Sequence, residues 1–374
     1  MKKLFFAFIL LFSLVSPTFA HASSSSLVLK INNKEVSSKL SPFISDGTTY
    51  VPINEIAKHM GGGPRTENNK VIIEVSGLTF VIVTANESKA LIYDSQLASR
   101  DKERQVPLKT QDVDGKTANV NAKAIYKNGQ LFVPLEFISS HDGLGYYVET
   151  VESDSQTIIY VGEVPEDVAD PIKKTGYATK ETIVVPSPGD FRNITSIVKN
   201  QQVYIARAQG EWYKIAVGKH YGFVKKDAVE IGKSPATGKM YPDGWFAPTL
   251  KSAWSKDPQV NYSTLENELG FRKGGIVYHI YGGKAIQVLD SGSDSYEVGI
   301  SFFGWENKTL EQSYRIPIVA KELFKLYFGN DYMKVWNYFD KNDIPENFTA
   351  NGRKVKAQFV EADGSLYLIV GRKK

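Results

Sequence analysis

The spacing of apolar residues in the first third of the chain predicts a short amphipathic helix. Apolar side chains occupy positions i, i+3, i+4 and i+7 of one segment: Ile53, Ile56, Ala57 and Met60. This spacing places them on one helix face, which we expect to be buried. Pro52 suits the first position of the helix, and Gly61 begins a glycine run that ends it.

The same pattern recurs after a shift of 82 positions, which aligns Asp46–Ile53 with Asn128–Leu135. Each copy begins with a tight turn, Asp46-Gly47 or Asn128-Gly129, of the kind that joins hairpin strands. A short strand, a Val-Pro pair and a hydrophobic helix follow. We interpret the match as an internal duplication. Further strands are predicted after the two helices, at 71–75, 79–83, 146–148 and 157–161.

This order of turn, strand, Val-Pro helix, glycine and two strands resembles the copper amine oxidase N-terminal-like domain, also called the stalk domain, over residues 27–161. The resemblance implies an α+β module that serves as a non-catalytic spacer or interaction unit. It does not imply copper, because the five His residues are scattered and no His-x-His pair exists. His59 and His141 coincide under the repeat, and favourable positions at two helix C-termini explain this more simply than a shared metal site. We expect no metal and no cofactor.

The N-terminal residues have the layout of a secretory signal peptide. Lys2 and Lys3 precede an apolar run from Leu4 to Val15, and the small-residue pattern Ala20-His21-Ala22 follows. The run is well short of the roughly 20 residues that cross a bilayer. We therefore predict a signal peptide at 1–22, no membrane span after its removal, and a secreted, extracellular protein that is associated with the cell wall or released.

Composition narrows the classes of function. The chain has 374 residues, of which 42% are hydrophobic and 23% charged, as in ordinary multidomain globular proteins. Its formal net charge is only +4, and the densest basic cluster, 100–109, contains acidic residues as well. Nucleic acid is therefore not an expected partner. The absence of Cys excludes disulfides, thiolate metal sites and a Cys nucleophile.

A small β-barrel is predicted at 173–232, after a Pro-containing linker at 162–172. Short strands alternate with turn residues, and the segments Gly210–Ile215 and Tyr221–Val224 resemble adjacent strands of the bacterial Src-homology-3 domain. The resemblance implies binding of a cell-wall peptide or glycan through aromatic side chains in a shallow groove. The candidate ligand contacts are Tyr177, Trp212 and Tyr221. Because neighbouring strand residues face opposite sides, either Trp212 or Tyr213 must face the barrel core.

The last segment, 236–374, is predicted to form a separate α+β domain, and it resembles no family. A capping box from Ser263 to Glu266 predicts the start of a helix that Gly270 ends. Strands are predicted at 275–281, 285–289 and 296–303. Two helical stretches follow, separated by a break near Gly329-Asn330. A hairpin of strands at 355–361 and 366–370 completes the chain. The whole protein is thus an α+β, β-rich multidomain chain.

No set of residues in the sequence points to a catalytic centre. Asp290 and Asp294 bracket a polar turn, where solvent contact explains them, and Glu266 is explained by helix capping. No Gly-x-Ser-x-Gly elbow or phosphate-binding loop occurs. We predict a non-catalytic protein of the bacterial cell envelope that binds peptidoglycan, another wall polymer or a protein partner. The alternative is a cell-wall hydrolase with a carboxylate-based C-terminal domain.

Overall fold

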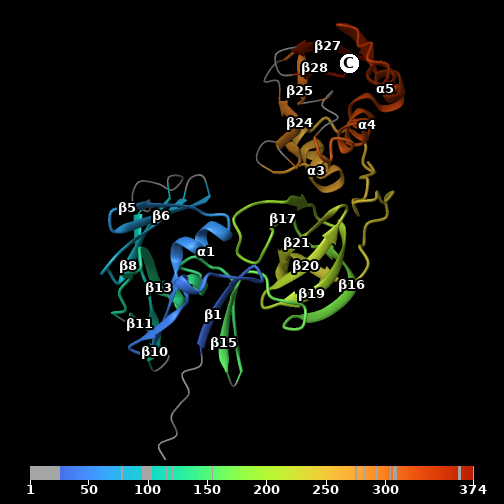
Figure 1. The fold of residues 1–374 in the computed structure, drawn as a ribbon. Helices are drawn as coiled ribbons and strands as arrows, with labels where there is room; N and C mark the ends of the chain where they lie inside the picture. Colours follow the sequence, from blue (N-terminus) through green and yellow to red (C-terminus); the bar gives the residue numbers. More distant parts are fainter. Residues whose placement is uncertain are drawn as a thin grey trace, which may run out of the picture.

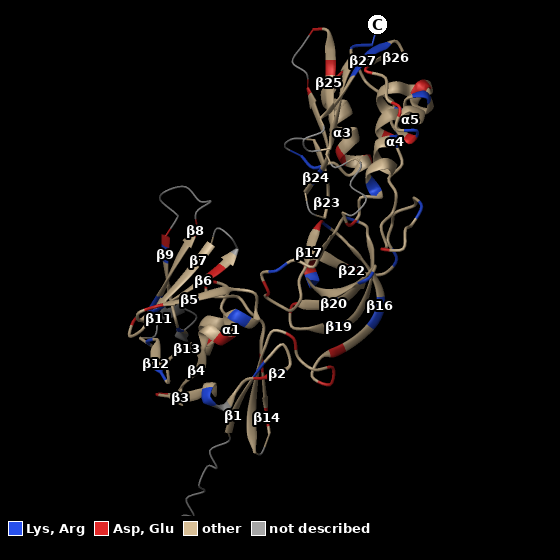
Figure 2. Cartoon of the chain, turned by 45° about the horizontal axis from the view of Figure 1, so that its top comes forward, with Lys and Arg blue, Asp and Glu red and all other residues tan. Residues whose placement is uncertain are grey.

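The computed structural model shows a β-rich chain with three successive folded parts (Figure 1). It describes residues 26–76, 79–94, 103–113, 116–119, 121–153, 155–273, 276–281, 283–290, 294–303, 305, 310–360 and 364–373. The predicted signal peptide at 1–22 lies outside the described residues. Lys and Arg are interspersed with Asp and Glu along all three parts (Figure 2).

The first part, residues 26–161, contains the two predicted copies. The first copy has the hairpin of β3 (Phe43–Ser45) and β4 (Thr48–Pro52), followed by α1 (Ile53–His59). The second has the hairpin of β12 (Ile125–Lys127) and β13 (Gln130–Pro134), followed by α2 (Leu135–Ser139). The strands β4 and β13 pair antiparallel with Val51 opposite Val133, which are equivalent residues of the repeat. The copies are therefore related by an approximate two-fold axis through this pair.

Both prolines occupy the N-cap position of their helices rather than the predicted first helical position. Pro52 and Pro134 end their strands and are the N-cap residues, so each helix begins with the following apolar residue. The buried helix face is the predicted one, since Ile53, Ile56 and Ala57 are inaccessible to solvent. Each hairpin is thus followed directly by a short helix, and both helices pack into one apolar core.

Two further sheets and a small hairpin complete the first part. One sheet has the order β14-β15-β1-β2, in which β1 and β15 run parallel: β1 Ser26–Ile31, β2 Lys34–Glu35, β14 Val148–Glu152 and β15 Gln156–Val161. The other is a meander: β5 Gly63–Glu67, β6 Lys70–Ser76, β7 Thr79–Thr84, β8 Lys89–Asp94 and β9 Glu103–Pro107. The strands β10 (Thr110–Val113) and β11 (Lys116–Asn119) form the hairpin. The strand predicted at 146–148 begins only at Val148, because the backbone N–H of Tyr146 donates to the carbonyl of Ile138 in α2 rather than to a neighbouring strand.

The second part is a curved antiparallel sheet in the order β21-β20-β19-β16-β22, with a short hairpin beside it. Its strands are β16 Asp170–Ala178, β17 Thr182–Val184, β18 Thr195–Ile197, β19 Gln202–Gln209, β20 Trp212–Val217, β21 His220–Lys225 and β22 Val229–Ile231. The last strand closes on the first, with Gly176 opposite Ile231. Strand β16 begins within the segment predicted as a linker.

The preceding segment, 162–169, is docked on this sheet. The carboxylate of Glu163 lies 2.6 Å from Nη2 of Arg207 and 2.5 Å from Nζ of Lys214. The side chain of Gln209 donates to the carbonyl of Gly162 at 2.9 Å. Two ion pairs and a hydrogen bond therefore hold the segment 162–169 on the sheet of the second part.

The third part packs three helices on one face of a six-stranded antiparallel sheet, in the order β23-β24-β25-β28-β27-β26. The helices are α3 Pro258–Leu269, α4 Arg315–Phe328 and α5 Tyr332–Asp340. The strands are β23 Val277–Ile280, β24 Gly283–Asp290, β25 Tyr296–Phe302, β26 Asn347–Ala350, β27 Arg353–Val360 and β28 Ser365–Gly371. Rings from sheet and helices interlock in the core, where the centroids of Phe324 and Phe339 are 4.7 Å apart.

The predicted start of α3 at Ser263 is wrong. The N-cap lies six residues earlier, at Asp257, and the helix begins at Pro258. A carboxylate oxygen of Asp257 accepts from the backbone N–H of Gln259 at 2.9 Å. Ser263 lies inside the helix, where its hydroxyl accepts from Asn267. The predicted end at Gly270 is confirmed, because this residue adopts the left-handed conformation with φ +79°.

Candidate functional site

Two tyrosines lie in one row on the outer face of the second part's sheet, and one of them, Tyr221, is a predicted ligand contact. The register places Tyr204 of β19 opposite Ala216 of β20, which is in turn opposite Tyr221 of β21. The alternating residues, such as Ile205 and Ile215, form the core below. Tyr221 is 71% exposed and Tyr204 is 46% exposed, so the row presents two aromatic side chains on either side of a small residue.

Tyr177 of β16 extends this row by one strand. It pairs with Gln202, two positions from Tyr204, which makes the two tyrosines diagonal neighbours on the same face. A hydrogen bond with Glu230, together with burial, raises the pKa of Tyr177, so its hydroxyl is already engaged by a neighbouring carboxylate. We call Tyr177, Tyr204 and Tyr221 the tyrosine face.

Trp212 lies on the same sheet face but not within the tyrosine face. It is four residues from Ala216 along β20, which corresponds to about 13 Å. The Nζ atom of Lys225 lies 4.3 Å from the centre of its ring, and this cation covers part of the aromatic surface. Tyr213 is the neighbour that packs against the core.

Tyr204 was not among the predicted ligand contacts. It is the third residue of β19, which runs from Gln202 to Gln209. The alternation of buried Val203, exposed Tyr204 and buried Ile205 was the available signal, because it places an aromatic residue on the outer face.

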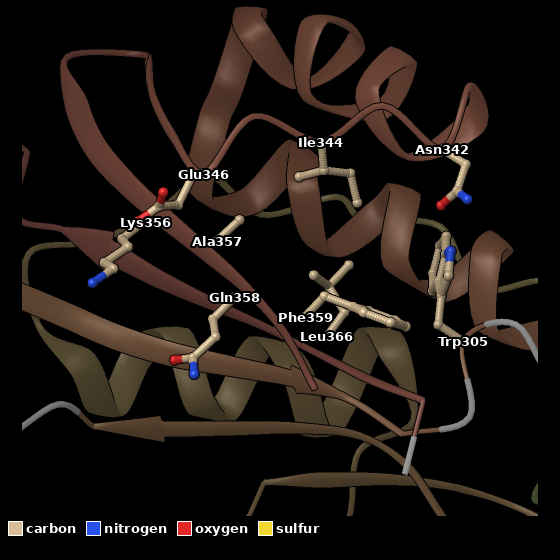
Figure 3. Close-up of a pocket in the computed structure, with 9 residues that line it drawn as sticks. All are labelled: Trp305, Asn342, Ile344, Glu346, Lys356, Ala357, Gln358, Phe359 and Leu366. Carbon is tan, nitrogen blue, oxygen red and sulfur yellow. The ribbon is translucent and has the colours of Figure 1, made fainter. Parts of the chain in front are cut away.

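The C-terminal part contains one cavity beside its sheet, with a volume of about 620 Å³ (Figure 3). Trp305, Ile344 and Phe359 supply apolar walls, and Glu346 is the single carboxylate among the described residues that line it. The two catalytic carboxyl groups of a glycosidase normally face each other across the substrate. The described residues of this cavity offer only one. Asp290 and Asp294, considered above as candidates, do not line it, and residues 291–293 between them lie outside the described part.

A second cavity, of about 540 Å³, lies between the second and third parts and is called here the boundary cavity. Asp243 and Glu311 both line it, and each carboxylate already has a partner side chain. Asp243 lies 2.6 Å from Nη2 of the fully buried Arg315. Burial acts to raise the pKa of Asp243, but the hydrogen bond and charge of Arg315 outweigh it, so the pKa is lower than usual. Glu311 lies 2.5 Å from Nε2 of His220.

The histidines that coincide under the repeat do not form a site with other ligands. His59 is the last residue of α1, and its Nδ1 lies 3.0 Å from the carbonyl of Glu55. His141 follows α2 by two residues. Within the ranges that the structure describes, no cluster of three or more His, Cys, Asp or Glu side chains is close enough to hold a metal ion. In the same ranges, every helix is too short or too polar to span a bilayer.

Comparison with known proteins identifies one region. The family model of the copper amine oxidase N-terminal domain matches residues 30–160, which is the duplicated first part. That domain is the non-catalytic one of its family. No curated protein matches the chain. No solved structure matches it either.

Proposed function

We propose that this chain is an exported, non-catalytic protein of the bacterial cell envelope that binds a wall polymer through its second part. The observation that carries the proposal is the tyrosine face, on which Tyr204 and Tyr221 are exposed in one row across neighbouring strands. Flat aromatic rings pack well against extended ligands, and tyrosine adds a hydroxyl for hydrogen bonding. The duplicated first part would serve as the stalk, and the apolar leader at 4–15 supports export.

We further propose that residues 173–232 form a bacterial Src-homology-3-like domain. The five-stranded sheet in which the last strand pairs with the first supports this assignment, since it gives a small, nearly closed barrel. Strands β20 and β21 contain the two segments that suggested the family. Peptidoglycan is the wall polymer that we expect to bind, and a protein partner is the alternative ligand.

Retention on purified cell walls tests the proposal. We expect Tyr204→Ala with Tyr221→Ala to reduce retention at least fivefold, because each ring supplies on the order of 1 kcal/mol of contact. Trp212→Ala should have a smaller effect, since Lys225 covers its ring. Tyr126→Ala is the matched control, because this tyrosine of the first part is also about half exposed, at 51%. Equal retention of all four proteins would remove the tyrosine face as a binding site.

The wall hydrolase remains the second candidate, because Asp243 and Glu311 line one cavity. A general acid must be protonated near neutral pH, however, and Arg315 lowers the pKa of Asp243 instead. Zymography on wall material separates the two functions. We expect no clearing zone; a zone produced by the wild type and lost in Glu311→Gln would establish the hydrolase.

A further inference from the structure

The boundary cavity has the position and size of a small-ligand site. Its volume of about 540 Å³ falls in the usual range for such sites, which often lie where two domains meet. Its walls come from several separate segments, which include the β20–β21 turn at 217–220, the turn at 241–243 and the residues 311–314 that precede α4. A ligand here would contact both the barrel and the C-terminal part.

The amide side chains of the cavity are held at both ends. Gln201 accepts from the backbone N–H of Val198 at 3.1 Å and donates to the carbonyl of Asp243 at 2.8 Å. Gln312 accepts from the N–H of Tyr281 at 3.0 Å and donates to the carbonyl of Ser196 at 3.2 Å. These four bonds fix the walls, so a ligand would not have to order them.

Gln312 is also strained. Its φ is +65°, a left-handed conformation that a side chain with a Cβ rarely adopts, and it is only 8% exposed. Such strain persists where surrounding contacts hold it, and it concentrates at binding and active sites. This observation is independent of the cavity's shape and points to the same place.

The lining combines aromatic surface with hydrogen-bond acceptors. The rings of Tyr241 and Tyr314 are neighbours, with centroids 5.3 Å apart, and both remain partly accessible. Asp243 and Glu311 line the same cavity. Arg315 pairs with Asp243, and Nε2 of His220 lies within hydrogen-bond distance of Glu311, so both carboxylates already have a partner in the protein.

We propose that the boundary cavity binds a neutral sugar ring. The C–H face of the ring would pack on Tyr241 and Tyr314, and its hydroxyl groups would donate to Asp243 and Glu311. The site is separate from the tyrosine face, which lies on the outer side of the barrel sheet. That the sugar belongs to the wall rests on the proposed function, whereas the sugar class rests on the cavity alone.

Titration of the full mature chain with the β-1,4-linked trisaccharide of N-acetylglucosamine, followed by calorimetry, tests the proposal. We expect measurable binding by the wild type and at least a tenfold loss of affinity in both Glu311→Gln and Tyr314→Ala. Glu311→Gln preserves the size of a partly exposed side chain, so it keeps the result interpretable if Tyr314→Ala disturbs folding. Tyr126→Ala should bind as the wild type does.

Two results would overturn the inference. One is a wild type that does not bind the trisaccharide at millimolar concentration. The other is a Glu311→Gln protein with unchanged affinity, including the case in which Tyr221→Ala abolishes binding and so locates the sugar on the tyrosine face. Neither result removes wall binding itself, because retention on walls is measured separately with the Tyr204 and Tyr221 variants.

Discussion

At the scale of single residues, Gly189 illustrates how the first two parts are held together. It adopts φ +86°, and a Cβ there would lie 2.7 Å from the Cα of Tyr146 in the first part. Gly189→Ala combines the left-handed penalty of about 1–2 kcal/mol with a backbone clash of roughly 1–3 kcal/mol. We expect faster amide hydrogen exchange in the segment around Tyr146, which would lose its packing against Phe191.

Gly129→Ala is the matched control for this prediction. Gly129 has a similar φ of +78°, but a Cβ there would meet nothing within 4 Å. The control therefore suffers the conformational penalty without the clash, and exchange around Tyr146 should stay close to that of the wild type. If both variants accelerate exchange equally, close approach at Gly189 does not hold the two parts together.

At the scale of secondary-structure elements, Glu163 holds the segment 162–169 on the sheet of the second part. It pairs with Arg207, whose side chain is only 7% exposed, and with Lys214. Glu163→Ala leaves a nearly buried guanidinium without its carboxylate, and because Glu163 itself is partly exposed we expect a loss of about 2 kcal/mol. Thermal unfolding followed by circular dichroism should show a transition lowered by several degrees.

Glu166→Ala serves as the control, because this exposed residue lies in the same segment. Its melting curve should match that of the wild type. A Glu163→Ala protein that melts like the control would mean that the segment behaves as the flexible linker that its composition suggested.

The elements that the sequence predicted well are those with a local signal. The turns at 46–47 and 128–129, the amphipathic helix after Pro52 and the hairpin of β27 and β28 follow from spacing and turn residues within a short segment. Contacts between distant segments were not predictable in this way. The pairing of Val51 with Val133 and the docking of Glu163 on Arg207 depend on tertiary structure, and no periodic pattern encodes them.

The candidate site divides in the same way. Tyr177 and Tyr221 could be nominated from the sequence because they belong to recognisable strands. Tyr204 could be placed on the same face only once the extent of β19 was known. The boundary cavity depends on the relative placement of several segments, of which 241–243 and 311–314 are far apart in the sequence. Single-sequence reasoning can nominate an aromatic strand residue, but it cannot assemble a cavity between domains.

At the scale of the whole molecule, Asp243 couples the second part to the C-terminal part. Its backbone carbonyl accepts from Gln201 of the second part, while its carboxylate pairs with Arg315, which has no exposed surface. Asp243→Asn would leave that guanidinium unpaired, at a cost of about 3 kcal/mol. Scanning calorimetry should then separate two transitions where the wild type gives one for these two parts.

The same carboxylate makes the coupling depend on pH. Because the pKa of Asp243 is lowered in the folded protein, its stabilisation is complete above the ordinary carboxyl pKa of about 3.9 and is lost as the pH falls through the lower folded value. The wild type should therefore acquire the two-transition profile in acid, whereas Asp243→Asn should show it at every pH. Asp340→Asn, at an exposed position at the end of α5, should keep the wild-type profile. A single transition in Asp243→Asn at neutral pH would mean that the remaining contacts, such as that between Gln312 and Ser196, are sufficient to join the two parts.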